Sequence, residues 1–363
     1  MFVIEQVIAA IRPLDADAME QCQLRLDNLT KPLGSLAGLE QLVRKMAGIT
    51  RQPRPQALKK TIVLMAADHG VVAEGVSAYP GEVTPQMVAN FCRGGAAINV
   101  FARHVDADLV LVDIGVAADL PDLPGLRREK IAYGTANMAK GAAMTGQQAL
   151  AAIETGLRVV RDELDKGAKV IGLGEMGIGN TTPSTAIIAC YAGQPLGELT
   201  GTGTGISPES LSHKVRVIEQ AIAVNRPDPK DPLDVLAKLG GLEIAGLVGV
   251  ILGAAAAGAA VVLDGVITGA AALIAVKMAP QVRDYLVGSH FSCEPAHGIA
   301  LDLIGVPAYL HLDMRLGEGT GAALGMSLIN ASLHVLNDMK TFGEARVAVA
   351  QDGPGALRQS IDI

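Results

Sequence analysis

The residues best suited to chemistry in this chain lie in the octet Arg315–Ala322, where a lone carboxylate stands between glycines. Gly317 and Gly319 flank Glu318 and allow the backbone to bend sharply and approach a ligand closely. Thr320 is expected to cap the helical run that follows. This arrangement predicts that Glu318 is a general base at the rim of a site. A turn that carries a solvated glutamate is the alternative that these eight residues leave open.

A second carboxylate lies in Gly172–Gly177, which matches GxGxxG after an apolar run. That spacing is typical of a dinucleotide loop and would suit a nicotinamide-linked oxidoreductase. However, Glu175 stands where a pyrophosphate would approach, and no strand ending in an acid follows at the usual distance. We therefore favour a polar-ligand loop that continues through Asn180 and Thr181, with Glu175 directed inward. A helix start capped by Thr182 is compatible with this interpretation.

A third motif, Gly201-Thr202-Gly203-Thr204-Gly205, lacks the lysine of a P-loop. Its backbone N–H groups and hydroxyls suit a monophosphate at the start of a helix. Ser207 is expected to begin that helix, with Lys214 one to two turns inside it. A flexible surface loop is the alternative interpretation.

No sequence motif has the ligand spacing of a metal centre, and the GxGxxG match is the one motif that would suit a bound cofactor. Asp68-His69 and Glu74 lack the ligand spacing of a zinc site, and His290, His297 and His311 are isolated. The cysteines are widely separated and predict free thiols in a reducing, cytoplasmic compartment: Cys22, Cys92, Cys190 and Cys293. We expect no metal and no cofactor.

Composition limits the class of protein further. At 363 residues the chain is long enough for one large domain and a smaller one. Half of the residues are hydrophobic but only 3% are aromatic, so the core must consist of Ala, Val, Leu and Ile. The net charge of -7 argues against nucleic acid as a partner. The uncharged stretch Ile244–Leu263 is long enough to span a membrane, but its Ala and Gly content favours a buried helix followed by a strand.

These motifs must be positioned by elements that alternate along the chain. Residues 1–58 have helical periodicity, over Val3–Ile11, Asp15–Leu29 and Leu36–Ala47. Four apolar runs then lead into polar or glycine-rich loops: Thr61–Ala67, Asp108–Val112, Ala168–Ile171 and Ala260–Leu263. Such strands alternating with helices predict an α/β fold with a parallel sheet covered on both faces. The ligand site is expected beyond the carboxyl ends of the strands.

Together the motifs resemble the nicotinate-nucleotide:dimethylbenzimidazole phosphoribosyltransferase family of the cobalamin nucleotide-loop pathway. The matching pieces occur in family order and span nearly the whole chain. They are Lys31–Leu36, Ala67–Val71, Gly94–Val100, Gly172–Thr182, Gly201–Gly205, Val261–Gly265, Ser289–His290 and Arg315–Ala323. The resemblance implies a Rossmann-like catalytic domain over 59–321 and a small helical domain from 1–58 and 322–363. It also implies a homodimer in which the partner's small domain helps to close each site.

The resemblance also implies roles for individual residues. Glu318 matches the catalytic base, and Glu175 is the second catalytic carboxylate. Residues assigned to phosphate and ribose are Gly177, Asn180, Thr181, Gly201, Thr202, Gly203, Lys214 and Asp264. Residues assigned to the acceptor base are Tyr79, Met87, Arg315 and Leu316. Some family members carry a smaller Ser in place of Tyr79, and some carry Gln in place of Met87, so the acceptor stays open among dimethylbenzimidazole, benzimidazole and adenine.

The implied reaction transfers phosphoribose from nicotinate mononucleotide to the base, with inversion at C1′. Glu175 would stabilise an oxocarbenium-like transition state, and Glu318 would accept the proton that the base loses. Apolar surroundings such as Leu316 are expected to raise the pKa of Glu318. The alternative from another class is a non-catalytic nicotinate-nucleotide sensor that uses the same loops.

Overall fold

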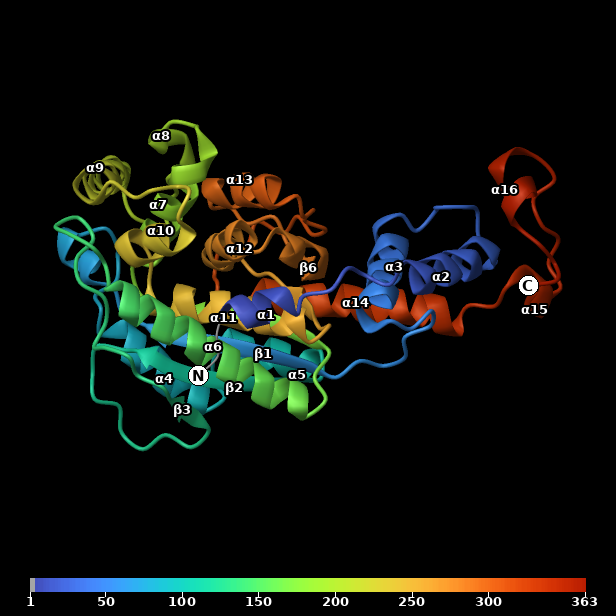
Figure 1. The fold of residues 1–363 in the computed structure, drawn as a ribbon, viewed down its shortest axis with the longest axis horizontal. Coiled ribbons are helices and arrows are strands. Elements are labelled where there is room, and N and C mark those ends of the chain that lie inside the picture. The colour runs from blue at the N-terminus through green and yellow to red at the C-terminus, as the bar shows by residue number, and fades with distance from the viewer. Residues whose placement is uncertain (1–3) are drawn as a thin grey trace.

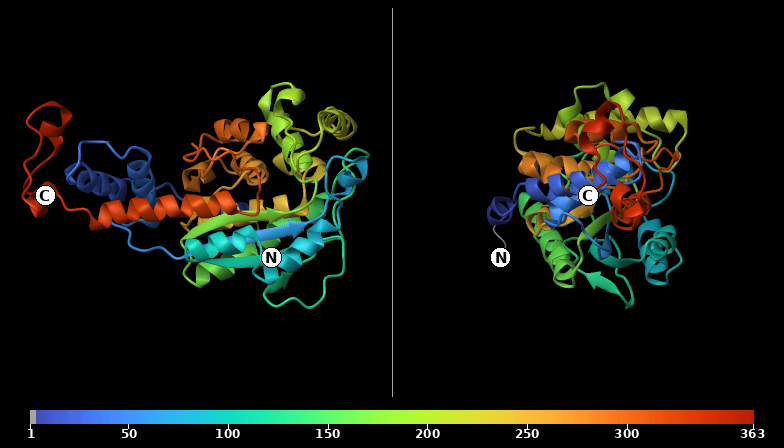
Figure 2. Two further views of the ribbon diagram at one scale, coloured as in Figure 1. Left: turned by 180° about the vertical axis from the view of Figure 1, so that it is seen from behind. Right: turned by 90° about the vertical axis from the view of Figure 1, so that its right-hand side faces the viewer.

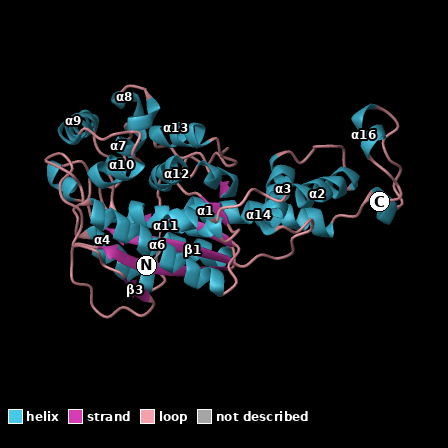
Figure 3. Ribbon diagram, viewed as in Figure 1, coloured by secondary structure: helices cyan, strands magenta, loops and turns pink. Residues whose placement is uncertain are grey.

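Six parallel strands form the centre of the fold, in the order β3-β2-β1-β4-β5-β6 (Figures 1 and 3). The structure, a computed structural model, describes residues 4–363. Winding reverses between the neighbouring strands β1 and β4, and this reversal is where open parallel sheets bind ligands. The strands are β1 Lys60–Ala67, β2 Ala107–Gly115, β3 Leu126–Arg128, β4 Val170–Met176, β5 Ala260–Val262 and β6 Leu286–Val287.

The α/β prediction is confirmed, and each of the four expected strands is present. One boundary was wrong, because Gly172 to Glu175 belong to β4 and not to the loop after it. The loop proper therefore begins at Gly177. The short edge strands β3 and β6 were not predicted, since three and two residues give no periodic pattern.

Helices cover both faces of the sheet. On one face, α4 (Val83–Cys92), α5 (Ala97–His104) and α14 (Thr320–Asp338) contact the central strands. On the other face, α11 (Leu242–Ala256) packs on the sheet and α6 (Gly146–Asp165) packs on α11. The sheet is thereby buried on both sides, which explains the continuous burial of β1.

The Gly- and Ala-rich stretch becomes α11 followed by β5, as the sequence indicated. Its glycines let two helices approach closely. A Cβ on Gly156 of α6 would lie 1.9 Å from the Gly246 carbonyl oxygen, and one on Gly249 would lie 2.0 Å from that of Ile153. Among residues 4–363, no helix has both the length and the apolar character needed to cross a membrane.

A second group of helices, arranged around α12, stands above the sheet in Figure 1. Its loops gather at the carboxyl end of the sheet, whereas η2 leads into β6 from the opposite end. The elements are η1 Gly70–Glu74, α7 Thr181–Ala192, α8 Leu196–Leu199, α9 Pro208–Asn225, α10 Pro232–Leu239, α12 Val266–Met278, η2 Pro280–Tyr285 and α13 Pro295–Ile304.

Helices from both chain ends form an extension beside the sheet (Figures 1 and 2). Helix α14 begins against β4 and runs outward to pack on α2 (Ala16–Asn28) and α3 (Gly38–Thr50). The C-terminal helices α15 (Phe342–Ala345) and α16 (Gly353–Arg358) lie at the far tip. Helix α1 (Ile4–Ala9) lies apart from them, against α11. Val3 of the expected first helix lies outside the described residues.

Candidate active site

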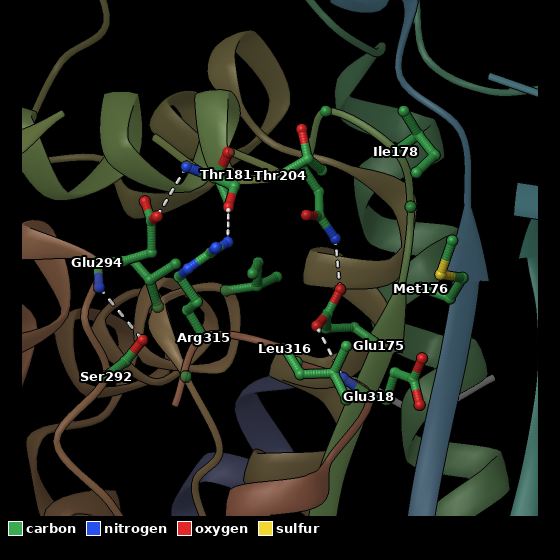
Figure 4. A pocket seen from close by; sticks show the side chains of 18 of the residues that line it. Glu175, Met176, Ile178, Thr181, Thr204, Ser292, Glu294, Arg315, Leu316 and Glu318 are labelled. Atoms are coloured by element: carbon green, nitrogen blue, oxygen red, sulfur yellow. Dashed lines mark hydrogen bonds between the residues drawn. The ribbon is translucent and has the colours of Figure 1, made fainter. Parts of the chain in front are cut away.

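A cavity of about 720 Å³ opens beyond the carboxyl ends of the strands (Figure 4). It is lined by the loop after β4, the start of α12, residues 290–294, the turn before α14 and the loop Gly201–Gly205, called here the glycine-threonine loop. Glu175 and Glu318 lie on one side of it, and Arg315, Thr181 and Glu294 lie on the other. Val83 and Met87 of α4 add an apolar wall.

Glu318 lies in an unusual turn at the pocket. Gly317, Glu318 and Gly319 all have positive φ, of 85°, 63° and 89°. This region suits glycine but is rare for other residues, so the surrounding contacts must hold Glu318 there. The side chain is buried, and Oε2 has no hydrogen-bond partner among the described residues. Burial raises the pKa of Glu318, and the favourable Ile98 N–H offsets this only in part.

The expected Thr320 cap was wrong in detail. Gly319 is the N-cap of α14, and the Thr320 hydroxyl instead donates to the Gly317 carbonyl at 2.8 Å. The orphan N–H groups of the helix start are satisfied by Asp264, whose Oδ2 accepts from Gly319 N at 2.8 Å and whose Oδ1 accepts from Gly321 N at 2.7 Å. Asp264 thus fixes the turn that carries Glu318.

The second carboxylate, Glu175, lies one residue before the end of β4 and is buried at the cavity wall. Asn180 donates its side-chain amide to Oε2, and the Glu318 N–H approaches Oε1 at 3.4 Å. Burial, followed by the charge of Asp264, raises the pKa of Glu175 to about 8. The two catalytic candidates are therefore in direct contact, through the backbone N–H of Glu318 and the side chain of Glu175.

The glycine-threonine loop is held from both sides. The Gly203 N–H donates to Glu294 Oε1 at 2.7 Å, and Arg315 donates to the Gly203 carbonyl at 3.0 Å. Beneath the loop, the Lys214 ammonium donates to Thr181 Oγ1 at 2.7 Å and to the Gly201 carbonyl at 3.2 Å. Burial lowers the pKa of Lys214 to about 8. This places a cation and a helix start at one end of the pocket, a setting that suits an anion.

The structure brings most of the predicted site residues to the pocket wall and leaves some behind it. Those that line the cavity are Tyr79, Met87, Glu175, Gly177, Asn180, Thr181, Gly203, Arg315, Leu316 and Glu318. Gly201, Thr202, Lys214 and Asp264 do not line it. Lys214 lies under the loop, and Asp264 binds backbone amides of the α14 start.

Sequence reasoning missed His290, Ser292 and Glu294, which also line the pocket. They follow β6, a strand of two residues that gave no apolar pattern. The polar run between Ser289 and Glu294 was the signal that could have found them. It was interpreted only as a family match at Ser289–His290.

His69, on which the metal alternative rested in part, instead forms a buried pair with Glu243, with 2.7 Å between Nε2 and Oε1. A Cβ on Gly177 would lie 3.1 Å from His69 Nε2, so this pair supports the loop after β4. Within residues 4–363, no group of three His, Cys, Asp or Glu side chains is arranged to hold a metal ion.

A Rossmann-like strand order, with two buried carboxylates and the glycine-threonine loop around a pocket at the carboxyl ends of the strands, defines an α/β protein whose site lies where such folds bind ligands. Comparison with known proteins identifies the family within this class. The family model described as Phosphoribosyltransferase matches residues 11–347, and the chain belongs to that family.

Relatives and solved structures agree with this family. The nicotinate-nucleotide–dimethylbenzimidazole phosphoribosyltransferase of Geobacter sulfurreducens is 54% identical over 348 residues, which is 96% of this chain and 99% of that protein. The protein of that name from Chloroflexus aggregans is 53% identical over equal shares. The crystal structure of CobT from Thermus thermophilus superposes with a TM-score of 0.88 at 45% identity and covers 92% of this chain and 99% of its own.

Proposed function

We propose that this chain transfers the 5-phosphoribosyl group of nicotinate mononucleotide to 5,6-dimethylbenzimidazole or a related base. The products are α-ribazole 5′-phosphate and nicotinate. The observation that carries the proposal is Glu318, a buried carboxylate with a raised pKa on the wall of a mononucleotide-sized pocket. The relatives at over half identity and nearly full length carry this activity in their names.

On the donor side, we place the phosphate at the glycine-threonine loop, near Lys214 and the start of α7. The C1′–N bond breaks, and nicotinate leaves with the bonding pair, so the leaving group needs no proton. Positive charge then develops on the ribose ring. Glu175 stabilises this charge once the pyridinium has displaced its proton.

On the acceptor side, we place the base between Tyr79, Met87 and Leu316. One ring nitrogen attacks C1′ with its lone pair from the face opposite nicotinate, which inverts the configuration. The other ring nitrogen loses its proton to Glu318. The raised pKa of Glu318 brings it closer to that of the proton donor, as efficient general-base catalysis requires.

A product assay with Glu318→Gln tests the proposal. We expect nicotinate release and α-ribotide formation by the unaltered chain, and a rate lower by about 10²- to 10⁴-fold in the variant, the usual contribution of a general base. Chromatography of both products measures this. Binding of the donor without turnover by the unaltered chain would instead indicate the sensor, which the comparisons do not favour.

We further propose a two-domain homodimer, with boundaries at 58/59 and 321/322, in which each small helical domain closes the partner's site. Exposed apolar side chains near the pocket mouth support this arrangement: Tyr79, Phe291, Leu312 and Leu316. The extended tip carries others, such as Leu357 and Ile361. Four unpaired cysteines are consistent with a reducing cytoplasm.

A further inference from the structure

The glycine-threonine loop is joined directly to the loop that carries the acceptor wall. Thr204 Oγ1 accepts the Ala78 N–H at 2.9 Å and lies 3.3 Å from the Ser77 hydroxyl. The Ser77 hydroxyl in turn accepts the Tyr79 N–H at 3.2 Å. Each of these two hydroxyls already accepts one backbone N–H, and either one can donate the proton of the hydrogen bond that joins them. A single threonine side chain therefore organises three consecutive residues of the opposite loop.

A second contact joins the same two regions. His213 of α9 donates from Nε2 to the Glu74 carbonyl at 2.6 Å. Its neighbour Lys214 holds the floor of the glycine-threonine loop through Thr181 and Gly201. Glu74 ends η1, just before the segment that Thr204 contacts. The phosphate side of the pocket thus contacts the segment between η1 and α4 at two points, through Thr204 and through His213.

On the side facing Glu294, the glycine-threonine loop makes a hydrogen bond for which a bound anion would compete. The Gly203 N–H is occupied by the Glu294 carboxylate, whose second oxygen has no partner among the described residues. Gly203 and Gly205 have φ of 53° and 96°. A phosphate that competes with the Glu294 carboxylate for this N–H changes the loop immediately before Thr204. Any such change reaches Ala78 and Tyr79 through the Thr204 hydroxyl.

We propose that Thr204 is a positioning residue that couples the two substrate subsites, so that phosphate in the glycine-threonine loop tightens binding of the aromatic base beside Tyr79. This inference rests on the proposed function for the assignment of the two subsites. Coupling between sites is reciprocal, so the base must tighten phosphate-end binding by the same factor.

The test is the affinity for 5,6-dimethylbenzimidazole with and without saturating ribose 5-phosphate, which fills the phosphate end but lacks a leaving group. Calorimetry on the full chain measures both affinities. We expect the sugar phosphate to tighten base binding about fivefold, the equilibrium factor of roughly one hydrogen bond. Thr204→Val keeps the branched shape without the hydroxyl, and should abolish this gain. Thr204→Ser keeps the hydroxyl, and should retain it.

Two further variants separate coupling from general damage. Thr50→Val removes a threonine hydroxyl that bonds the Met46 carbonyl in α3, away from the pocket, and should keep the full gain. Ser77→Ala removes only the partner hydroxyl and should reduce the gain, which supplies a test if Thr204→Val does not fold. A gain that survives in Thr204→Val, is lost in Thr204→Ser, or is missing from the unaltered chain overturns the proposal.

Turnover distinguishes this inference from the proposed function. We expect Thr204→Val to raise the KM for the base about fivefold at saturating donor, while the kcat falls less. An unaltered chain that turns over without any coupling refutes only the role of Thr204. An unaltered chain that shows no turnover refutes the proposed function, whatever Thr204 does to binding.

Discussion

At the scale of single residues, two glutamates in one pocket differ in what surrounds them. Glu175 is enclosed and accepts hydrogen bonds from Asn180 and from the Glu318 backbone, whereas Glu318 has an oxygen without a partner among the described residues. Burial raises the pKa of both. Two carboxylates near one reacting centre can therefore have different roles: one stabilises a developing positive charge, and the other accepts a proton.

The raised pKa of Glu175 predicts that donor binding releases a proton. At pH 7 the empty site holds Glu175 mainly protonated, because its pKa is about 8. A cationic pyridinium favours the carboxylate, so nicotinate mononucleotide should displace up to one proton. Calorimetry in buffers of different ionisation enthalpy, without acceptor base, measures this number. Glu175→Gln should reduce it to near zero, and an unchanged number in the variant would assign the proton to another group.

The same group predicts how stability changes with pH. The pKa of Glu175 is about 8 in the folded chain against an ordinary value of 4.5, so between these values the folded state holds the proton more tightly. Stability should therefore fall as pH rises from about 4.5 to 8, by an amount on the order of a few kcal/mol. Denaturant unfolding at pH 5 and pH 8 should show a smaller fall for Glu175→Gln. The exposed Glu198→Gln is the control that should leave the fall unchanged.

Functional residues could be predicted from the sequence where neighbouring glycines pointed to an unusual backbone conformation. Glu318 was found because glycines on both sides have no helical or strand purpose, and the structure shows the positive φ values that they permit. Asp264 was predicted as a ribose residue, yet its carboxylate lies on two backbone N–H groups of the α14 start. That partner lies over fifty residues away in the chain, and no local pattern reveals it. Glu294 was missed because β6, the strand before it, has only two residues and gave no apolar pattern.

At the scale of elements, the glycines of β4 explain why a loop motif is here a strand. A Cβ on Gly174 would lie 2.7 Å from the Glu318 carbonyl oxygen, and one on Gly172 would lie 2.8 Å from the Met326 methyl carbon. These glycines therefore let α14 and its turn lie directly on the strand. The apolar runs predicted the strands correctly, but glycine spacing alone cannot distinguish a phosphate loop from a strand on which a helix packs.

The junction between β5 and α14 gives a prediction at this scale. Asp264→Asn keeps one acceptor but turns an NH₂ group toward a backbone N–H, which loosens the Glu318 turn. We expect the kcat to fall about 10- to 100-fold, the effect of losing a charge-assisted hydrogen bond, while donor affinity changes little. Steady-state kinetics with donor-binding measurements and the Tm check this. A weakened donor affinity at constant kcat would instead place Asp264 on the ribose.

At the scale of the whole molecule, the site and the helical extension are connected by α14. The helix starts at the Glu318 turn and ends beside α2 and α3, outside the sheet (Figure 1). The extension holds an exposed loop, Pro32–Ser35, anchored by the buried pair of Lys31 and Glu40 at 2.9 Å. A well-anchored exposed loop suits a docking role, and we place it at the partner's pocket in the proposed homodimer.

Subunit mixing tests this arrangement. Ser35 is exposed, so Ser35→Trp should leave its own fold intact but obstruct docking in the partner's pocket. Ser35→Trp and Glu318→Gln should each be nearly inactive alone. Co-expressed, they form mixed dimers with one site that combines an intact Glu318 and an intact loop, which should restore about a quarter of the activity under random pairing.

The matched control for mixing is the double variant Ser35→Trp/Glu318→Gln co-expressed with the unaltered chain. In its mixed dimers one site lacks the Glu318 carboxylate and the other faces the obstructed loop, so only the unaltered homodimers, about a quarter of the population, should be active. Shared sites therefore predict equal activity from the two mixtures. Sites closed within each chain predict almost none from the first mixture and about half from the control, because half of its chains are unaltered. Light scattering should give each preparation twice the chain mass of 37.4 kDa, and full activity of Ser35→Trp alone would show that the loop does not close the partner's pocket.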